Sequence, residues 1–151
     1  MRFRRARPGD VGAILRLMRG LYRHDRLPYR VGTARAALTG LMRAPRFGRV
    51  YVVDAGGELA GYFVLTLSWS LMYTGADAFV DELYLAPSHR GQGLGRRAVD
   101  FLLARCRDFD VRALHLEVER DNRRARALYR TAGFVDHRQV LMTRWLRRTG
   151  S

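Results

Sequence analysis

The sequence of 151 residues contains no lysine. All 28 basic residues are arginine, against 14 acidic residues, and the formal net charge is +14. A strongly basic protein suggests polyanionic partners, so a nucleic-acid-binding module is one function to weigh. Such a module needs basic residues gathered on one element beside stacking aromatic residues. Here the arginines are spread along the whole chain, with no run of five or six. We interpret them mainly as a compositional bias and expect no specific nucleic-acid partner.

Cysteine and long hydrophobic runs are also scarce. The single cysteine, Cys106, excludes an internal disulfide. No apolar run reaches the length of a membrane-spanning helix. The first ten residues, MRFRRARPGD, are charged but lack the apolar core of a signal peptide. We therefore expect a cytoplasmic protein with no membrane contact and no metal site. The length predicts one domain, residues 1–148, with a short tail at 149–151.

Hydrophobic periodicity predicts an alternation of strands and helices. An edge strand at 2–7 is followed by helices from Asp10 to about His24 and from Thr33 to Pro45. Three antiparallel strands follow at 49–54, 59–71 and 79–85. The chain then forms a helix from Leu94, a strand at 113–119, a helix at 123–132 and closing strands at 134–135 and 139–146. The strand–helix–strand unit from 79 to 119 is typical of a parallel crossover.

A glycine-rich turn separates the strand at 79–85 from the next helix. It reads Arg90-Gly91-Gln92-Gly93-Leu94-Gly95. Its alternating glycines leave backbone N–H groups uncovered at a helix N-terminus, an arrangement that holds phosphate. Arg90, Arg96 and Arg97 add donors around it. The spacing fits neither the dinucleotide fingerprint nor the Walker A loop. A glycine-rich helix start without a ligand remains the alternative interpretation.

A second group of residues lies on the helix at 123–132. Asn122 and Tyr129 are seven residues apart, which is two helical turns, so they share one face. Ala125 lies between them and leaves room for a ligand along that face. An asparagine helix cap and a half-buried tyrosine without a ligand would be the structural alternative.

Together the two segments resemble the signatures of the GNAT superfamily of N-acetyltransferases. The turn matches Arg/Gln-x-x-Gly-x-Gly/Ala, and the segment from Asn122 to Phe134 matches N-x-x-A-x-x-L-Y-x-x-x-G-F. The resemblance covers residues 2–146. It implies an α/β (α+β) fold with a single mixed sheet of six to seven strands, mostly antiparallel with a parallel splayed pair, flanked by about four helices. It also implies acetyl-CoA as cofactor and an enzyme that acetylates a primary amine by direct attack in a ternary complex.

The resemblance assigns roles to several residues. Gly91, Gln92, Gly93, Leu94 and Gly95, with Arg90 and Arg96, would hold the pyrophosphate of CoA. The strand residues Leu83, Tyr84 and Leu85, together with Asn122 and Tyr129, would contact the rest of the cofactor. Tyr129 would protonate the departing sulfur. Asp81, or Glu82 beside it, would act as the base. Since neighbours on a strand point to opposite faces, only one of the two carboxylates should face the acceptor.

The acceptor stays open at this point. Within the superfamily, the strand V-D-E-L-Y-L resembles that of diamine and polyamine acetyltransferases, but a tight polyamine site needs more carboxylates than the plausible set of Asp25, Asp77, Asp81, Glu82 and Asp136. The loops at 22–32, 68–78 and 136–139 should shape the acceptor site. The resemblance also implies a homodimer that pairs through the strand at 139–146. A non-catalytic acyl-CoA sensor on the same scaffold is the other alternative.

Overall fold

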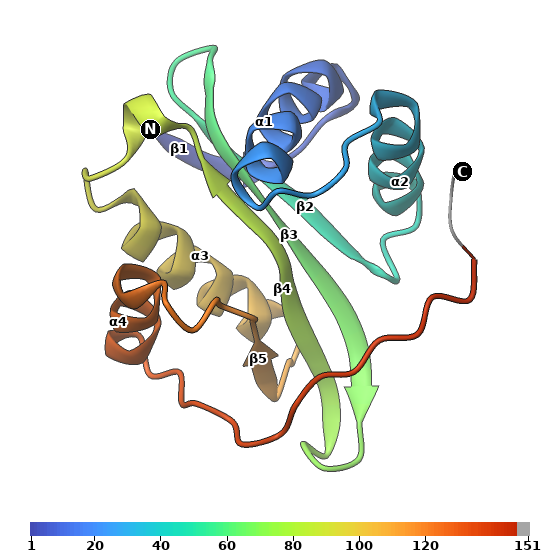
Figure 1. Cartoon of the computed structure of the whole chain (residues 1–151), viewed down its shortest axis with the longest axis vertical. Coiled ribbons are helices and arrows are strands. Elements are labelled where there is room, and N and C mark those ends of the chain that lie inside the picture. The colour runs from blue at the N-terminus through green and yellow to red at the C-terminus, as the bar shows by residue number, and fades with distance from the viewer. Residues whose placement is uncertain (148–151) are drawn as a thin grey trace.

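Within residues 1–147, which the computed structural model describes, the chain forms one five-stranded sheet with helices on both faces (Figure 1). The tail predicted at 149–151 lies outside the described residues, as does residue 148 at the end of the predicted domain. The strands are β1 (Arg2–Arg5), β2 (Gly48–Asp54), β3 (Leu59–Ser70), β4 (Gly75–Leu85) and β5 (Ala113–His115). They lie in chain order across the sheet, and only β4 and β5 are parallel. The predicted mixed α/β class is confirmed.

The helices are α1 (Val11–His24), α2 (Val31–Arg43), α3 (Leu94–Asp108) and α4 (Arg123–Thr131), with short 3-10 turns η1 (Pro8–Asp10) and η2 (Pro87–His89). α2 begins at Val31 and not after a Thr33 cap, because the Ala34 N–H already donates to the Arg30 carbonyl and closes the first turn there. β4 likewise begins at Gly75, four residues before the predicted start, because it pairs with β3 up to Ser70.

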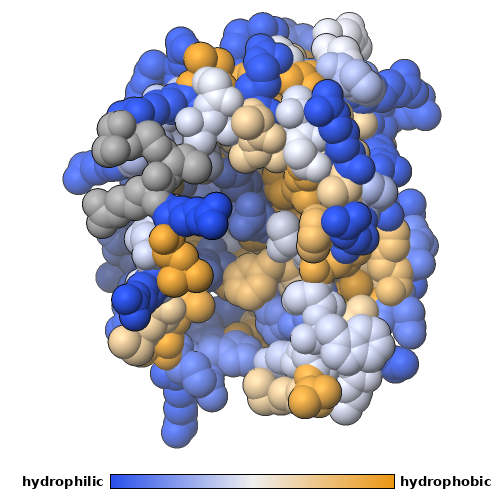
Figure 2. Space-filling view, turned by 90° about the vertical axis from the view of Figure 1, so that its right-hand side faces the viewer, coloured by the Kyte–Doolittle hydropathy of each residue, from blue (hydrophilic) through white to orange (hydrophobic). Residues whose placement is uncertain are grey.

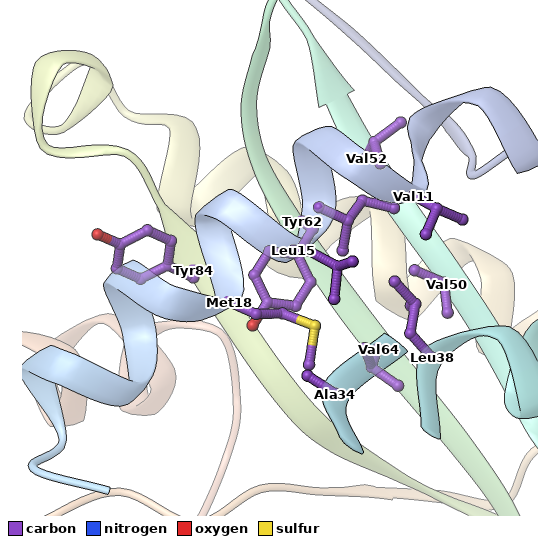
Figure 3. Close-up of a cluster of buried hydrophobic side chains, with 11 residues drawn as sticks. Val11, Leu15, Met18, Ala34, Leu38, Val50, Val52, Tyr62, Val64 and Tyr84 are labelled. Carbon is purple, nitrogen blue, oxygen red and sulfur yellow. The ribbon is translucent and has the colours of Figure 1, made fainter. Parts of the chain in front are cut away.

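Side chains alternate between the two faces of β2 and β3 and build two cores. On one face, Val50, Val52, Tyr62 and Val64 pack against α1 and α2. Figure 3 shows Tyr62 beneath α1, beside Leu15 and Met18. On the other face, strand residues pack against α3; the buried members of this second core are Tyr51, Val53, Ala60, Phe63, Leu65, Ala78, Leu94, Ala98, Leu102 and Cys106.

The prediction of six to seven strands is wrong, because residues 134–135 and 139–146 form no strand. Asp136 forms ion pairs with Arg126 at 2.8 Å and Arg130 at 2.6 Å, which tie the start of this segment to α4. β5 offers only three residues as an edge for pairing. The predicted strand at 113–119 therefore ends at His115, and the last described residues run across the molecule without joining the sheet (Figure 1).

Most of the exposed large hydrophobic side chains among the described residues lie in two segments. The turn between β3 and β4 exposes Trp69, Leu71 and Met72, and the C-terminal segment exposes Val135, Val140, Leu141, Met142, Trp145 and Leu146. On the face shown in Figure 2, hydrophobic groups lie among hydrophilic ones and border a hollow. None of the described helices is long and apolar enough to cross a membrane.

Candidate active site

A cavity of about 220 Å³ lies where β4 and the chain after β5 separate. The parallel pairing of these strands ends at Phe79 and His115. Beyond that point β4 forms one wall and residues 116–117 form another, while α1, the loop after it and α4 complete the lining. The lining residues are Leu21, Tyr22, Asp25, Leu27, Val80, Asp81, Glu82, Leu83, Leu116, Glu117 and Tyr129.

A β-bulge in β4 brings both predicted carboxylates to this cavity. Val64 on β3 pairs with Glu82, and the next residue, Leu65, pairs with Val80, so Asp81 is the extra residue. Val80 and Leu83 are an odd number of residues apart and would lie on opposite faces of a regular strand. Because the bulge shifts the alternation by one residue, both pack toward the α3 core. The prediction that only one of Asp81 and Glu82 can face the acceptor is therefore wrong, since both line the cavity.

Glu82 is held by two phenols. The Tyr22 hydroxyl donates to Oε1 and the Tyr62 hydroxyl donates to Oε2, each at 2.8 Å. Burial raises the pKa of Glu82, and these two hydrogen bonds oppose that rise. Asp81 is reached by solvent at the cavity rim, and the surrounding protein raises its pKa as well. The pKa values of both carboxyl groups are thus raised toward the range in which a general base works.

Tyr129 of α4 lines the same cavity as the carboxylates of β4. Its ring makes an edge contact with Phe134, with the ring centroids 5.8 Å apart. Burial raises the pKa of its phenol, so the hydroxyl remains protonated near neutral pH. The structure thus brings Asp81, Glu82, Leu83 and Tyr129 together at one cavity, as four of the predicted site residues.

The glycine turn lies just before α3. Gly91 and Gly93 have positive φ angles of 80° and 72°, and nothing lies within 4 Å of a Cβ added at either position. Gly93 occupies the N-cap position of α3, and exposed Gln92 lies between the two glycines. Gly95 differs, because a Cβ there would meet Leu128 of α4 at 3.2 Å, and Leu94 is buried in the core. Gly91 and Gly93 therefore leave backbone open to a ligand, whereas Gly95 makes room for α4.

Three predicted cofactor residues make other contacts. The Arg90 Nε donates to the Leu85 carbonyl at 2.9 Å, and the guanidinium lies over the Tyr84 ring. Arg96 pairs with Asp100 on α3. The Asn122 carboxamide accepts the Ala125 N–H at 3.1 Å and so caps α4. None of these side chains lines the cavity.

The backbone of β4 also faces the gap. The Ala86 N–H donates to the Ala60 carbonyl on β3. Because backbone groups alternate in direction along a strand, the amides of Leu85 and Leu83 point away from β3, toward the side where β5 has ended. They are available to a ligand that enters between the two strands.

The sequence assigns no catalytic or cofactor role to three polar residues of the lining, Tyr22, Asp25 and Glu117, or to buried Tyr62, which contacts Glu82. Tyr22 belongs to the apolar face of α1 and Tyr62 to the sheet core, so periodicity alone classed both as packing residues. Asp25 was one plausible carboxylate among five, and Glu117 was placed on a strand that is not formed there. The loop at 22–32 does contribute to a wall, through Tyr22, Asp25 and Leu27.

A second buried polar cluster lies elsewhere on the sheet. Asp77 accepts a hydrogen bond from the Ser68 hydroxyl at 2.6 Å and contacts His115 Nε2 at 3.2 Å. Because the carboxylate lies between the serine and the histidine, the histidine does not contact the hydroxyl as a base would. The cluster stabilises the pairing of β3, β4 and β5. No group of residues that could hold a metal ion occurs in the described part of the chain.

Comparison with known proteins agrees with this geometry. The sequence profile of the Acetyltransferase (GNAT) family matches residues 14–134. A thialysine N-epsilon-acetyltransferase of Bos taurus is 31% identical over 146 residues, which cover 88% of this chain and 83% of the relative. A putative [ribosomal protein bS18]-alanine N-acetyltransferase of Bacillus subtilis (strain 168) is 32% identical over 87 residues, covering 58% of this chain and 54% of the relative.

Solved structures share the fold. The crystal structure of an integron cassette protein from the mobile metagenome of Cole Harbour Salt Marsh superposes with a TM-score of 0.86 at 33% identity, covering 97% of this chain and 91% of that one. The family profile spans most of the chain. The chain belongs to the acetyltransferase (GNAT) family of enzymes.

Proposed function

We propose that this protein is an acetyl-CoA-dependent N-acetyltransferase that acetylates a primary amine by direct attack in a ternary complex. The observation that carries the proposal is the cavity between β4 and residues 116–117, which Asp81, Glu82 and Tyr129 line together. Acetyl transfer needs a base for the amine and an acid for the departing thiolate, and these residue types supply both. The membership of the GNAT family supports the same reaction.

The residues present suit acetyl-CoA. Bound there, the cofactor would supply the activated thioester. The open backbone at Gly91 and Gly93, at the positive end of α3, is suited to its pyrophosphate. Arg90 and Arg96 are close enough in sequence to add charge once their present contacts are released. The free amides of Leu83 and Leu85, on either side of Tyr84, would pair with an extended ligand as an added strand does. Asn122 would contribute by fixing the start of α4.

The catalytic roles follow from the groups at the cavity. An alkyl ammonium has a pKa near 10.4, so the acceptor arrives mostly protonated and must lose a proton. Asp81 or Glu82 receives that proton. The Leu85 N–H is placed to polarise a carbonyl in the gap, as a single oxyanion donor. The Tyr129 hydroxyl donates its proton to the departing sulfur, and a phenol that remains protonated is suited to that role.

The acceptor is proposed to be a cationic amine with a second positive charge. Among the described residues that line the cavity, four carry carboxylates and none is arginine, in a chain of net charge +14. The four are Asp25, Asp81, Glu82 and Glu117. One can act as base while the others attract a second charge. The relatives named for thialysine and for a ribosomal protein alanine support an amine acceptor.

A calorimetric titration with acetyl-CoA tests the cofactor. The wild-type protein should bind, and Gly93→Asp should lose at least tenfold in affinity because a carboxylate at the turn repels phosphate. Aspartate tolerates the left-handed backbone at Gly93, so the variant should fold. Gly56→Asp is the matched control, since Gly56 has a φ of 88° and open surroundings in the turn between β2 and β3. No binding by the wild type at millimolar acetyl-CoA would contradict the proposal, and equal binding by Gly93→Asp would exclude the turn as the phosphate site.

A further inference from the structure

Glu82 accepts hydrogen bonds from two different elements at once. Tyr22 reaches it from α1 and Tyr62 from β3, and each hydroxyl takes a separate carboxylate oxygen at 2.8 Å. Tyr62 is fully buried, and Tyr22 is half-buried at the cavity. A carboxylate fixed through both oxygens cannot rotate freely, so its remaining lone pairs keep a constant direction.

The register of β3 and β4 creates this arrangement. Tyr62 pairs with Tyr84 and Val64 pairs with Glu82, so Tyr62 and Glu82 are diagonal neighbours on the sheet. Figure 3 shows Tyr62 on the face that α1 covers. Regular alternation from Tyr84, which lies in the α1 core, places Glu82 on the same face as the two phenols. The bulge then inserts Asp81 beside Glu82 without changing the direction of Glu82. Asp81, exposed at the rim, has no hydrogen-bond partner among the described residues.

Among the groups around Glu82, the two phenols favour its charged form and the neighbouring carboxylates disfavour it. Burial and the Glu82 charge both raise the pKa of Tyr22 and of Tyr62, so both phenols stay protonated and donate. The carboxylates around Glu82 disfavour its charge, and the two phenol hydrogen bonds are the contacts that favour it. The titratable groups that face Glu82 or share its cavity are Tyr22 of α1, Asp25 just after α1, Tyr62 of β3, Asp81 of β4, Glu117 after β5 and Tyr129 of α4.

We propose that Tyr22 and Tyr62 are positioning residues that hold Glu82 as the carboxylate that takes the proton from the acceptor amine. This inference rests on the proposed function. In the step, the acceptor ammonium first gives one proton to Glu82, which passes it to solvent. The neutral amine nitrogen then bonds to the acetyl carbon, and its remaining excess N–H proton passes to Glu82. The C–S bond breaks with its electron pair on sulfur, which takes the Tyr129 proton. Glu82 then returns a proton to solvent and Tyr129 regains one, so charge and atoms balance. Asp81 attracts the cationic acceptor at the rim.

Carbon-13 NMR titration of the glutamate carboxyls tests the holding role without any turnover. The chain has only four glutamates, Glu58, Glu82, Glu117 and Glu119, and Glu82→Gln identifies the Glu82 signal. Tyr22→Phe removes one hydroxyl that favours the carboxylate, so the Glu82 pKa should rise by about one unit. Tyr62→Phe should raise it in the same direction. Since Tyr62 is buried in the core, Tyr22→Phe decides the question if Tyr62→Phe fails to fold.

Tyr29→Phe is the matched control. Tyr29 packs edge-on against Tyr22 at 5.7 Å but donates its hydroxyl to the Leu15 carbonyl, away from Glu82. This variant should leave the Glu82 pKa unchanged. An unchanged pKa in Tyr22→Phe, or an equal rise in Tyr29→Phe, would overturn the holding role.

The pH dependence of kcat/KM, measured with acetyl-CoA and thialysine, tests the role of Glu82 as base. On the acidic side of the pH profile, the acid limb, kcat/KM falls about tenfold for each pH unit below the pKa of the base. In Tyr22→Phe this limb should move to higher pH by the same amount as the Glu82 pKa measured by NMR. Glu82→Gln should abolish the limb and Asp81→Asn should keep it. A limb that disappears with Asp81→Asn would overturn the assignment. A wild-type protein that binds acetyl-CoA but acetylates no amine would overturn the proposed function and the base role together, while the NMR result would still decide the holding role.

Discussion

Tyr129 presents its phenol to the cavity from α4, and an edge contact with Phe134 fixes the ring. A hydroxyl that protonates the thiolate acts only as the C–S bond breaks. It therefore contributes to the transition state and little to the bound ground state. A packing residue would show the opposite pattern, because its loss would disturb the fold and not the chemical step.

Tyr129→Phe separates these two roles. The substitution keeps the ring and its contact with Phe134, so acetyl-CoA affinity should change little. The turnover number should fall about 10²–10⁴-fold, the usual effect of removing a positioned acid, while the Michaelis constant for acetyl-CoA stays nearly constant. Steady-state kinetics with chemistry shown to be rate-limiting give the answer. Turnover at the wild-type rate would make Tyr129 a packing residue.

Single residues also mark the limit of what the sequence predicts. Spacing and resemblance predict Tyr129, Asp81, Glu82 and the glycine turn as site residues, because motifs report on short stretches of chain. They do not predict the bulge at Asp81, since nothing in V-D-E-L-Y-L distinguishes a bulged strand from a regular one. The phenols at Glu82 were missed for a related reason. Tyr22 and Tyr62 are 60 and 20 residues away from it, and only the register of the sheet brings them there.

At the scale of elements, strand and helix order was predictable, but pairing at the C-terminus was not. Periodicity in Gln139–Leu146 indicates a strand, yet a strand needs an edge to pair with, and β5 supplies only three residues.

Ion pairs join the N-terminal elements β1, η1 and β2. Arg4 of β1 forms ion pairs with Asp10 of η1 at 2.8 Å and Asp54 of β2 at 3.0 Å, and all three side chains are largely buried.

The ion pairs of Arg4 predict that the free energy of unfolding depends on pH. The Arg4 guanidinium lowers the pKa of Asp10 below its ordinary 3.8. The Gly57 amide and Arg4 lower the pKa of Asp54 to about 2. A lowered pKa in the folded state means that the unfolded chain binds more protons below pH 4. The stabilisation is therefore present above about pH 4 and is lost as the pH falls toward 2.

Arg4→Met should lower the melting temperature by about 2–6 °C near pH 7, and by progressively less as the pH falls toward 2.5. Circular dichroism melts across this range measure the difference. Arg5→Met is the control, since exposed Arg5 has no carboxylate partner among the described residues, and it should change the melting temperature little at any pH. A difference between Arg4→Met and the wild type that is equal at pH 7 and pH 2.5 would contradict this account.

At the scale of the whole molecule, the exposed C-terminal segment supports a homodimer. Residues 139–146 expose Val140, Leu141, Met142, Trp145 and Leu146, and surfaces this apolar mark interaction sites. We propose that the segment pairs with a second copy of the chain. Light scattering at tens of micromolar should give the dimer mass. Leu141→Glu should give the monomer, because it places a charge on the apolar segment while leaving both cores intact. A wild-type monomer would contradict the proposal. The cytoplasmic location stays a prediction.

The most direct test of acetyl transfer is the release of free CoA with a panel of amines. The panel comprises thialysine, a peptide with a free N-terminal alanine and a simple monoamine. Since the chain has no lysine, no lysine side chain of the protein itself can accept the acetyl group. We predict release that requires both acetyl-CoA and an amine, is fastest with thialysine, which carries two ammonium groups, and yields an amine heavier by one acetyl group. Binding of acetyl-CoA with no release above background for any amine would contradict the account and indicate an acyl-CoA sensor.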